Sequence, residues 1–216
     1  MGTLKKLLVQ KVNWDFLKAE ELSLRFDEAN IVFHKIDKVN WETYPYCPEV
    51  SFRIAHNGEF IFLNYRVNES DIKAVCDHDN GRIWEDSCVE FFVSFNKESY
   101  YNIECNCIGK LLIAKGAGRE NRIPLPETLI KHVDRWSNLG DSPVENLSGN
   151  WEVSLIIPKE IFCPEITGSF NNTEATGNLY KCGDLLQTPH FLSWNHIHTE
   201  KPDFHRPEFF GQLLFE

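Results

Sequence analysis

The sequence predicts an all-β protein, a jelly-roll-like β-sandwich of about nine or more antiparallel strands with one or two short peripheral helices. Three observations support this prediction. The 216 residues include 16 Phe, 6 Trp and 6 Tyr, and aromatic residues favour strands. Short segments of alternating apolar and polar residues recur at hairpin spacing, and sustained 3.6-residue periodicity is scarce. We expect a single domain over residues 1–216, in which residues 1–37 form an N-terminal extension packed on the sandwich.

Two β-hairpins are the clearest local features. Residues 50–55 and 59–67 flank Asn57-Gly58, a pair that accepts the positive φ of a two-residue turn. A second hairpin joins residues 100–107 to residues 110–115 around Gly109. The other predicted strands are residues 7–12, 31–36, 89–95, 151–157, 178–182, 191–194 and 212–215.

Helix is predicted in only two places. Residues 15–26 have a partial apolar stripe, and residues 126–132 begin with a proline that suits a helix start. Residues 116–122 are rich in Gly and charged side chains, and residues 137–150 collect Ser, Asn, Asp, Gly and Pro. Both segments are expected to be loops over the sheet edges.

Composition and charge exclude several classes of partner. The net charge is −10 and no cluster of Lys and Arg occurs, so neither nucleic acid nor a membrane surface is favoured. No apolar run approaches the roughly 20 residues of a membrane span. The first residues lack the apolar core of a signal peptide, which leads us to expect a cytoplasmic protein with free, mostly buried thiols at its 7 cysteines. The oligomeric state is left open.

The most informative segment is residues 83–95, IWEDSCVEFFVSF. The odd-numbered positions of Val89–Phe95 can fill a core, which leaves Glu90 on the opposite face of the strand. If the extended geometry runs back past residue 87, Trp84 and Asp86 share the side of Glu90. An indole beside a carboxylate suits a sugar, whose C–H face stacks on an aromatic ring while its hydroxyls donate to the acid. The alternative is the ordinary start of a strand, with no ligand.

Two loops carry metal-ligating side chains. Asp77, Asp79 and Asn80 offer oxygen atoms close together in the chain, which suggests a calcium corner, although the spacing falls short of an EF-hand. A solvated turn is the alternative for this loop.

The histidines at positions 196, 198 and 205 form the second candidate, this time for a transition metal. Only Thr199 separates the second histidine from Glu200, which is too short for the cupin pattern. Surface or ligand-contacting histidines are the alternative.

Two motifs together resemble the family 9 carbohydrate-binding modules. Residues 83–93, IWEDSCVEFFV, are similar to the Trp-Glu-x-Asp-Ser-Val-Glu-Ile-Phe strand of that family. Residues 203–213, DFHRPEFFGQL, resemble its closing Pro-x-x-Phe-Gly-x-Leu strand, and Leu192-Ser193-Trp194 looks like the Ile-Ser-Trp before it. The resemblance covers about residues 38–216, and residues 116–150 have no assignable match.

The resemblance implies non-catalytic binding of a mono- or oligosaccharide, with a terminal sugar unit held between two aromatic side chains. Trp84 takes the place of one clamp residue, and Phe204 takes the place of a second tryptophan. Because phenylalanine lacks the indole N–H, sugar selectivity or the strength of the clamp is expected to differ. Glu90 matches the acidic ligand contact of the family, whereas a family arginine falls near Glu104.

Other polar residues of the two motifs extend the predicted ligand site. Asp86 on the first motif, and His205 and Arg206 beside Phe204, are expected to contribute hydrogen bonds to sugar hydroxyls. No cofactor is required by this function. Family members often carry structural calcium, which favours the corner formed by Asp77, Asp79 and Asn80 as an ion site.

Two other function classes stay open. A glycoside-acting enzyme would use Glu90 with Asp86 or Glu85 as acid and base, because hydrolysis needs two carboxyl groups across a cleft. A haem-binding or interaction domain would draw its axial ligands from the histidines at 196, 198 and 205. The resemblance favours a protein that is not an enzyme.

Overall fold

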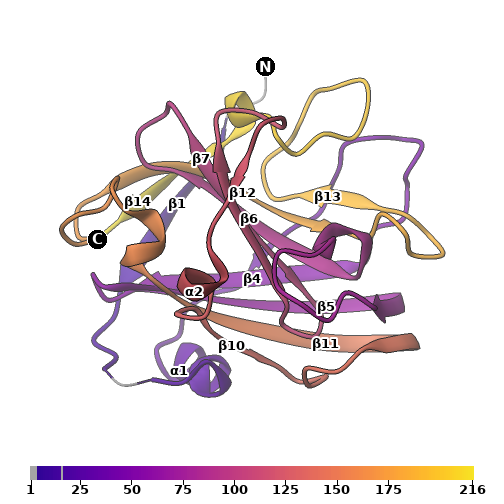
Figure 1. Ribbon diagram of the computed structural model, residues 1–216, viewed down its shortest axis with the longest axis horizontal. Helices are drawn as coiled ribbons and strands as arrows, with labels where there is room; N and C mark the ends of the chain where they lie inside the picture. The colour runs from indigo at the N-terminus through magenta and orange to yellow at the C-terminus, as the bar shows by residue number, and fades with distance from the viewer. Residues whose placement is uncertain (1–3, 16) are drawn as a thin grey trace.

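The computed structural model describes residues 4–15 and 17–216, which fold into two packed β-layers with short helices at their edges (Figure 1). The strands are β1 (Lys6–Lys11), β2 (His34–Lys35), β3 (Lys38–Val39), β4 (Glu49–His56), β5 (Phe60–Ala74), β6 (Cys88–Ser94), β7 (Tyr100–Asn106), β8 (Leu111–Gly116), β9 (Ile123–Pro124), β10 (Asp134–Ser137), β11 (Val144–Pro158), β12 (Glu174–Cys182), β13 (Phe191–Ser193) and β14 (Gly211–Phe215). The helical segments are η1 (Ala19–Glu21), α1 (Leu22–Glu28), η2 (Ile83–Glu85), α2 (Glu127–Ile130), η3 (Lys159–Phe162) and η4 (Pro207–Phe209). None of the helices in the described residues has the length and apolarity needed to cross a membrane.

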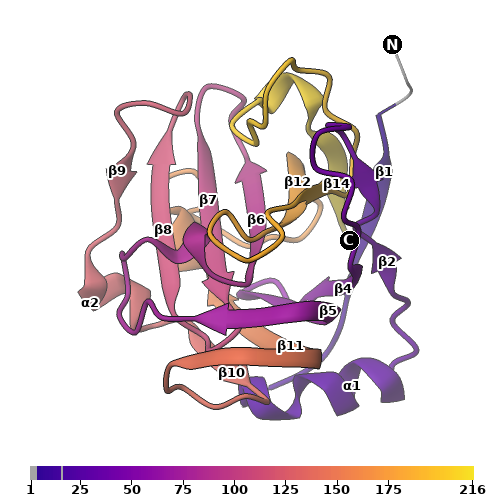
Figure 2. The same ribbon diagram turned by 90° about the vertical axis from the view of Figure 1, so that its right-hand side faces the viewer.

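One strand, β1, connects the two layers. Its first four residues pair in parallel with β14, and its last two residues, Gln10 and Lys11, pair in parallel with β4. We name the first layer the β6 sheet; its order is β14-β12-β6-β7-β8-β9. The second layer, the β5 sheet, has the order β10-β11-β5-β4. Figure 2 shows the strands of the β6 sheet rising across those of the β5 sheet.

The main core lies between the sheets and follows from alternation along the strands. Val89, Phe91 and Val93 of β6 are fully buried in the same cluster as Leu63 of β5 and Leu155 of β11. Each such side chain contributes roughly 1.5–3 kcal/mol by leaving water. The predicted parity of β6 is therefore confirmed.

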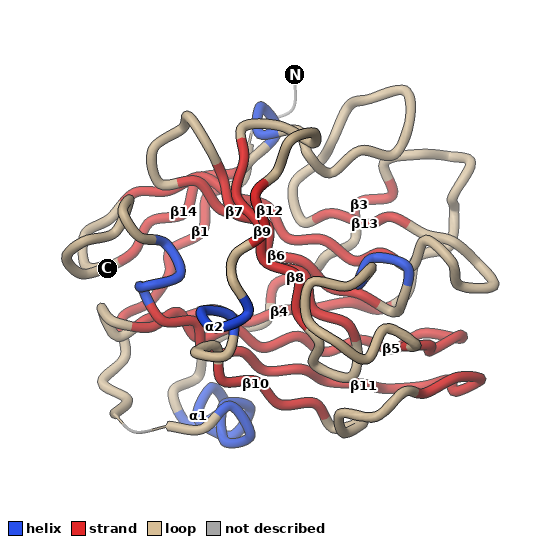
Figure 3. Tube along the Cα trace, viewed as in Figure 1, coloured by secondary structure: helices blue, strands red, loops and turns tan. Residues whose placement is uncertain are grey.

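Two smaller apolar clusters cover the outward faces of the sheets. On the β6 sheet, Phe92, Tyr180 and Phe204 pack together. Phe204 belongs to the long segment between β13 and β14, most of which is loop (Figure 3). On the β5 sheet, α1 buries Leu22 and Phe26. Because β6 is enclosed on both faces, even the side chains that alternate away from the core are shielded from bulk water.

A buried ion pair joins the two sheets. Lys181 Nζ of β12 lies 2.8 Å from Glu69 Oε2 of β5, and both side chains are fully buried. Trp151 Nε1 donates to Glu69 Oε1 at 2.6 Å, and His190 Nε2 lies 2.8 Å from Lys181 Nζ. Burial and the neighbouring ammonium lower the pKa of His190 to about 3. The imidazole is therefore neutral and can accept a hydrogen bond from Lys181.

The structure confirms the β-sandwich and both predicted hairpins, which are β4–β5 and β7–β8. The loop predicted over residues 137–150 is wrong, because β11 begins at Val144 and pairs with the far end of β5. Most of residues 145–150 are exposed, so this end of the strand carries no apolar alternation that would predict it. Of residues 31–36, only His34–Lys35 form a strand.

The helix predicted over residues 15–26 starts later and ends later than expected. It comprises η1 and α1, which span Ala19–Glu21 and Leu22–Glu28, and residue 16 lies outside the described residues. The second predicted helix is confirmed as α2 within residues 126–132. Strand β1, which falls inside the expected N-terminal extension, is a member of both sheets.

Replacing one member of the buried ion pair should cost stability. In Lys181→Met, the Glu69 carboxylate would remain buried without its cation, and we expect the free energy of unfolding to fall by about 3–5 kcal/mol. Urea denaturation followed by fluorescence measures this change. The double substitution Lys181→Met, Glu69→Gln should recover part of the loss, and a single variant as stable as the native sequence would contradict the importance of the pair.

Candidate functional site

A cleft of about 510 Å³ opens on the outward face of the β6 sheet. Side chains of β6, β7, β8 and β13 line it, together with residues 80–82, Trp84 of η2, Arg119, Arg122, Pro124, Asp184, and residues 202–205 before β14. The volume lies within the roughly 300–1,000 Å³ that is typical of small-molecule sites. Of the residues predicted to bind ligand, the cleft brings together Trp84, Glu90, Phe204 and His205.

Trp84 supplies an open aromatic surface at one side of the cleft. It belongs to the 3-10 turn η2, and its backbone is fixed because its carbonyl accepts the amide N–H of Asp184 at 3.1 Å. The side chain is half-buried, and the guanidinium carbon of Arg82 lies 5.9 Å from its ring centre. Among the described residues, no other aromatic ring stacks on the indole. The exposed part of the indole lines the cleft.

Two carboxyl groups face each other across neighbouring strands of the cleft. Glu90 of β6 is directly opposite Glu104 of β7, and the two residues are only 3% and 4% exposed. Burial and the neighbouring Glu104 raise the pKa of Glu90 well above its ordinary value. Burial raises the pKa of Glu104 to about 7, against the effect of a hydrogen bond from Asn102. Two like charges this close and this buried favour retention of a proton by the pair.

A third acid and two arginines complete the polar lining. Burial raises the pKa of Asp184 to about 6, although Arg119 acts in the opposite direction. Arg122 stacks its guanidinium 4.2 Å from the ring centre of Tyr100. It donates to the side-chain oxygen of Asn102 and to three backbone carbonyls. Arg122 is therefore held rigidly at the edge of the cleft.

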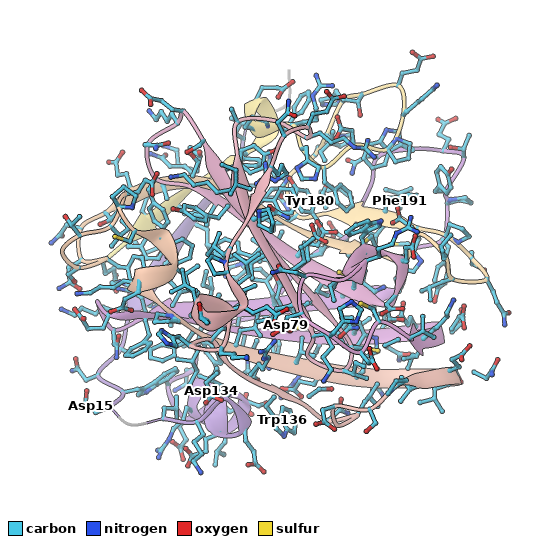
Figure 4. All side chains as sticks on the ribbon, viewed as in Figure 1. Asp15, Asp79, Asp134, Trp136, Tyr180 and Phe191 are labelled. Carbon is cyan, nitrogen blue, oxygen red and sulfur yellow. The ribbon has the colours of Figure 1, made fainter. Side chains whose placement is uncertain are left out.

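Phe204 is more enclosed than a free stacking platform. It is 8% exposed, and one of its faces stacks on Tyr180 with ring centres 4.2 Å apart and an interplanar angle of 7°. Phe191, from β13, touches Phe204 edge-on at 6.1 Å and is half-buried in the same cleft. Figure 4 labels Tyr180 and Phe191 on the ribbon. The aromatic residues around Phe204 are thus a packed group, of which Phe191 is the more exposed member.

The two polar neighbours of Phe204 differ in position. His205 lines the cleft, and its Nδ1 lies 2.9 Å from the hydroxyl of Tyr100. Burial and the two arginines at 119 and 122 lower its pKa to about 3, so the imidazole is neutral. Arg206 does not line the cleft and instead donates to Glu208 at 2.6 Å.

Asp86 does not reach the cleft. It is 1% exposed, and its carboxylate accepts the amide N–H groups of Val75 and Cys76 and the side-chain amide of Asn106. The predicted alternation fails here because residues 83–85 form a 3-10 turn, which rotates Asp86 toward the loop after β5. Its role is to hold that loop against the β6 sheet.

The predicted calcium corner is held by hydrogen bonds within the protein. Both oxygens of Asp79 accept from Arg135, at 2.6 and 2.8 Å, and one also accepts the amide N–H of Leu111. Asn80 donates to the carbonyl of Leu125 at 3.0 Å. Asp77 is exposed beside His78. A guanidinium thus occupies the position that a cation would need at Asp79.

The three histidines predicted as metal or haem ligands do not lie together. His196 and His198 stack with ring centres 4.3 Å apart and are exposed. His205 lies in the cleft, bonded to Tyr100. Within the described residues, the one cluster with several metal-ligating atoms close together is formed by Cys88, Glu90 and Cys182.

Sequence reasoning missed part of the cleft. The sequence pointed to Glu104 only as the residue near which a family arginine falls. It did not assign Arg122, Asp184 or Phe191 to a site. Only Glu104 could have been placed in the site from the strand pattern, because it lies on the same face of β7 as Asn102. The pairing of β7 with β6 then brings it opposite Glu90. The others lie in loops or at a strand end that only the tertiary fold brings to the cleft.

The fold and the cleft define a β-sandwich protein with an aromatic and acidic small-molecule site. The model of carbohydrate-binding family 9 matches residues 20–215, and the chain belongs to that family. No curated protein matches the chain.

Solved structures agree with this assignment. A "putative carbohydrate-binding protein" of Bacteroides uniformis is 48% identical, with a TM-score of 0.95 over 99% of this chain and 100% of that chain. A family 9 module of Caldicellulosiruptor kristjanssonii in complex with glucose is 10% identical, with a TM-score of 0.64 over 98% and 96% of the two chains. A family 9 module of the same organism in complex with cellotriose has a TM-score of 0.63 at 10% identity, over 98% of this chain and 94% of that chain. At 10% identity, the last two comparisons establish the fold.

The buried carboxyl pair makes stability depend on pH. Since the pKa of Glu104 rises from its ordinary 4.5 to about 7 on folding, the native state binds the proton more tightly than the unfolded chain. The native state is therefore disfavoured as the pH rises from about 4.5 to about 7. Glu104→Gln cannot ionise, and we expect it to gain on the order of 1–3 kcal/mol relative to the native sequence across that window. Urea unfolding at both ends of the window tests this, with the exposed Glu160→Gln as control; a difference independent of pH would contradict it.

Proposed function

We propose that this protein binds a mono- or oligosaccharide in the cleft on the β6 sheet, without cleaving it. The observation that carries the proposal is an indole surface at Trp84, free of aromatic neighbours among the described residues, in the same cleft as the buried acids Glu90 and Glu104. Sugars present an apolar C–H face and a polar edge of hydroxyls, and this cleft offers a counterpart to each.

In the proposed complex, a terminal sugar unit stacks on Trp84 and directs its hydroxyls toward Glu90. A stacked ring contributes about 1 kcal/mol beyond the area that it buries, and each hydrogen bond contributes a similar net amount. The expected affinity is therefore in the micromolar to millimolar range, which corresponds to about 4–8 kcal/mol.

The second aromatic wall is assigned to Phe204 together with Phe191. Phe204 is supported from behind by Tyr180, which favours a fixed ring position, and Phe191 adds exposed aromatic surface beside it. This wall lacks a donor of its own, because neither ring carries an N–H or O–H group. His205 is a neighbouring polar group of the cleft that can contribute a hydrogen bond, since the contact with Tyr100 engages only its Nδ1.

Binding is favoured over hydrolysis by the match to a carbohydrate-binding family, and the two acids that the sequence suggested as catalytic partners of Glu90 are engaged by other groups. Glu85 pairs with Arg82 at 2.5 Å, and Asp86 is saturated by backbone and amide donors outside the cleft. Neither is therefore free to act with Glu90 as the acid and base pair that glycoside hydrolysis requires.

Neutral glucose-type sugars are suitable first probes, since family 9 modules of C. kristjanssonii have been solved with glucose and with cellotriose. Titration of glucose, cellobiose and cellotriose, followed by tryptophan fluorescence and by heat, should show saturable binding. Trp84→Ala should weaken it about tenfold or more, because the stacking surface is lost.

The matched control is Trp136→Ala, which removes a half-buried tryptophan of β10 that does not line the cleft. Binding by this variant should equal that of the native protein. Absence of binding by the whole panel, or equal weakening by both substitutions, would overturn the proposed function.

A further inference from the structure

Three acids in the cleft have no cationic partner. Among the described residues, no Lys or Arg nitrogen lies within 4.0 Å of a carboxyl oxygen of Glu90, Glu104 or Asp184. The hydrogen bond found for Glu90 Oε1 comes from the thiol of Cys182 at 3.1 Å, and a thiol is a weak donor. Buried acids normally have an ion pair or several strong donors.

The cations of the cleft are already engaged elsewhere. Arg122 donates four hydrogen bonds, one to the side chain of Asn102 and three to backbone carbonyls, and Arg82 pairs with Glu85. Arg119 is exposed and lies 4.0 Å from Asp203. The arginines around the cleft are therefore held by other partners, and none of them forms an ion pair with the three acids.

One carboxyl oxygen of Glu104 lacks a hydrogen-bond donor. Its Oε1 accepts from Asn102 at 2.8 Å, whereas Oε2 is fully buried and has no partner in the structure. Glu104 is 96% enclosed and lines the cleft directly opposite Glu90. A buried carboxyl oxygen without a donor is unfavourable, and a ligand group that donates to the Glu104 carboxyl group would relieve this cost.

We infer that the preferred ligand is an amino sugar, whose ammonium group binds between Glu90 and Glu104. This inference rests on the proposed function and specifies the class of sugar. An ammonium carries three donors and a positive charge, so one group can satisfy both carboxyls. A hydroxyl supplies one donor and no charge, and it leaves the two acids repelling each other or sharing a proton.

The protonation of the acids agrees with a cationic ligand. Burial raises the pKa values of Glu104 and Asp184 to about 7 and 6, although Arg122 and Arg119 respectively act in the opposite direction. A bound ammonium would supply a positive charge and favour ionisation of the pair.

The test compares three matched ligands at about pH 7, where an amine is largely protonated. Glucosamine, glucose and N-acetylglucosamine are titrated by calorimetry, and the galactose series is run in parallel because the ring configuration is unknown. We expect the amino sugar of one series to bind at least about tenfold tighter than its neutral counterparts, as a charge-assisted hydrogen bond provides.

Substitution identifies the acids responsible. In Glu104→Gln the ratio of amino-sugar to neutral-sugar affinity should fall to near one, and Glu90→Gln, which removes the other carboxyl group of the proposed ammonium site, serves as the second variant. The exposed Glu160→Gln, of the same chemistry, should keep the native ratio.

The outcomes separate this inference from the proposed function. Binding of neutral and amino sugars with equal affinity, or a preference unchanged in both acid variants, would overturn the amino-sugar inference and leave saccharide binding intact. Absence of binding by every sugar would overturn both. A preference for the amino sugar that disappears in the acid variants would support both.

Discussion

Strand β6 is enclosed on both faces, and this constraint organises the molecule. Because successive side chains alternate, its seven residues must fill the sandwich core with one set and form the floor of a cleft with the other. Val89 and Phe91 exclude water on the first side. On the second side, Phe92 anchors the aromatic cluster, and Glu90 is left in a medium where its charge is poorly solvated. The raised pKa of Glu90 is therefore a direct result of the position of this strand.

Much of the fold could be predicted from the sequence, because its strands are short, alternating and separated by turn residues. The exceptions lie where alternation is absent or interrupted. The exposed start of β11 has no apolar face to signal a strand, and the 3-10 turn at Ile83–Glu85 changes the side to which Asp86 points. Parity within β6 placed Glu90 correctly, since no irregularity falls inside that strand.

The sequence predicted some residues of the candidate site but not those that set its charge, and the reason is physical. Trp84, Glu90 and Phe204 lie in two motifs that resemble a family pattern, but the groups that decide the electrostatics come from elsewhere in the chain. Arg122 reaches the cleft from the segment before α2, and Asp184 follows the end of β12. Their importance depends on distances across strands and loops, which neither composition nor spacing encodes.

Strand β1 has a consequence for how the chain reaches this state. It pairs with β14 at one end and with β4 at the other, and the amide of Lys11 donates to the side chain of Glu216, 205 positions away. Contacts this distant in sequence carry a large loop-closure cost and are associated with slow folding. During synthesis, β1 has no partner in the β6 sheet until β14 has left the ribosome, so closure of the sandwich is the last of these pairings to become possible.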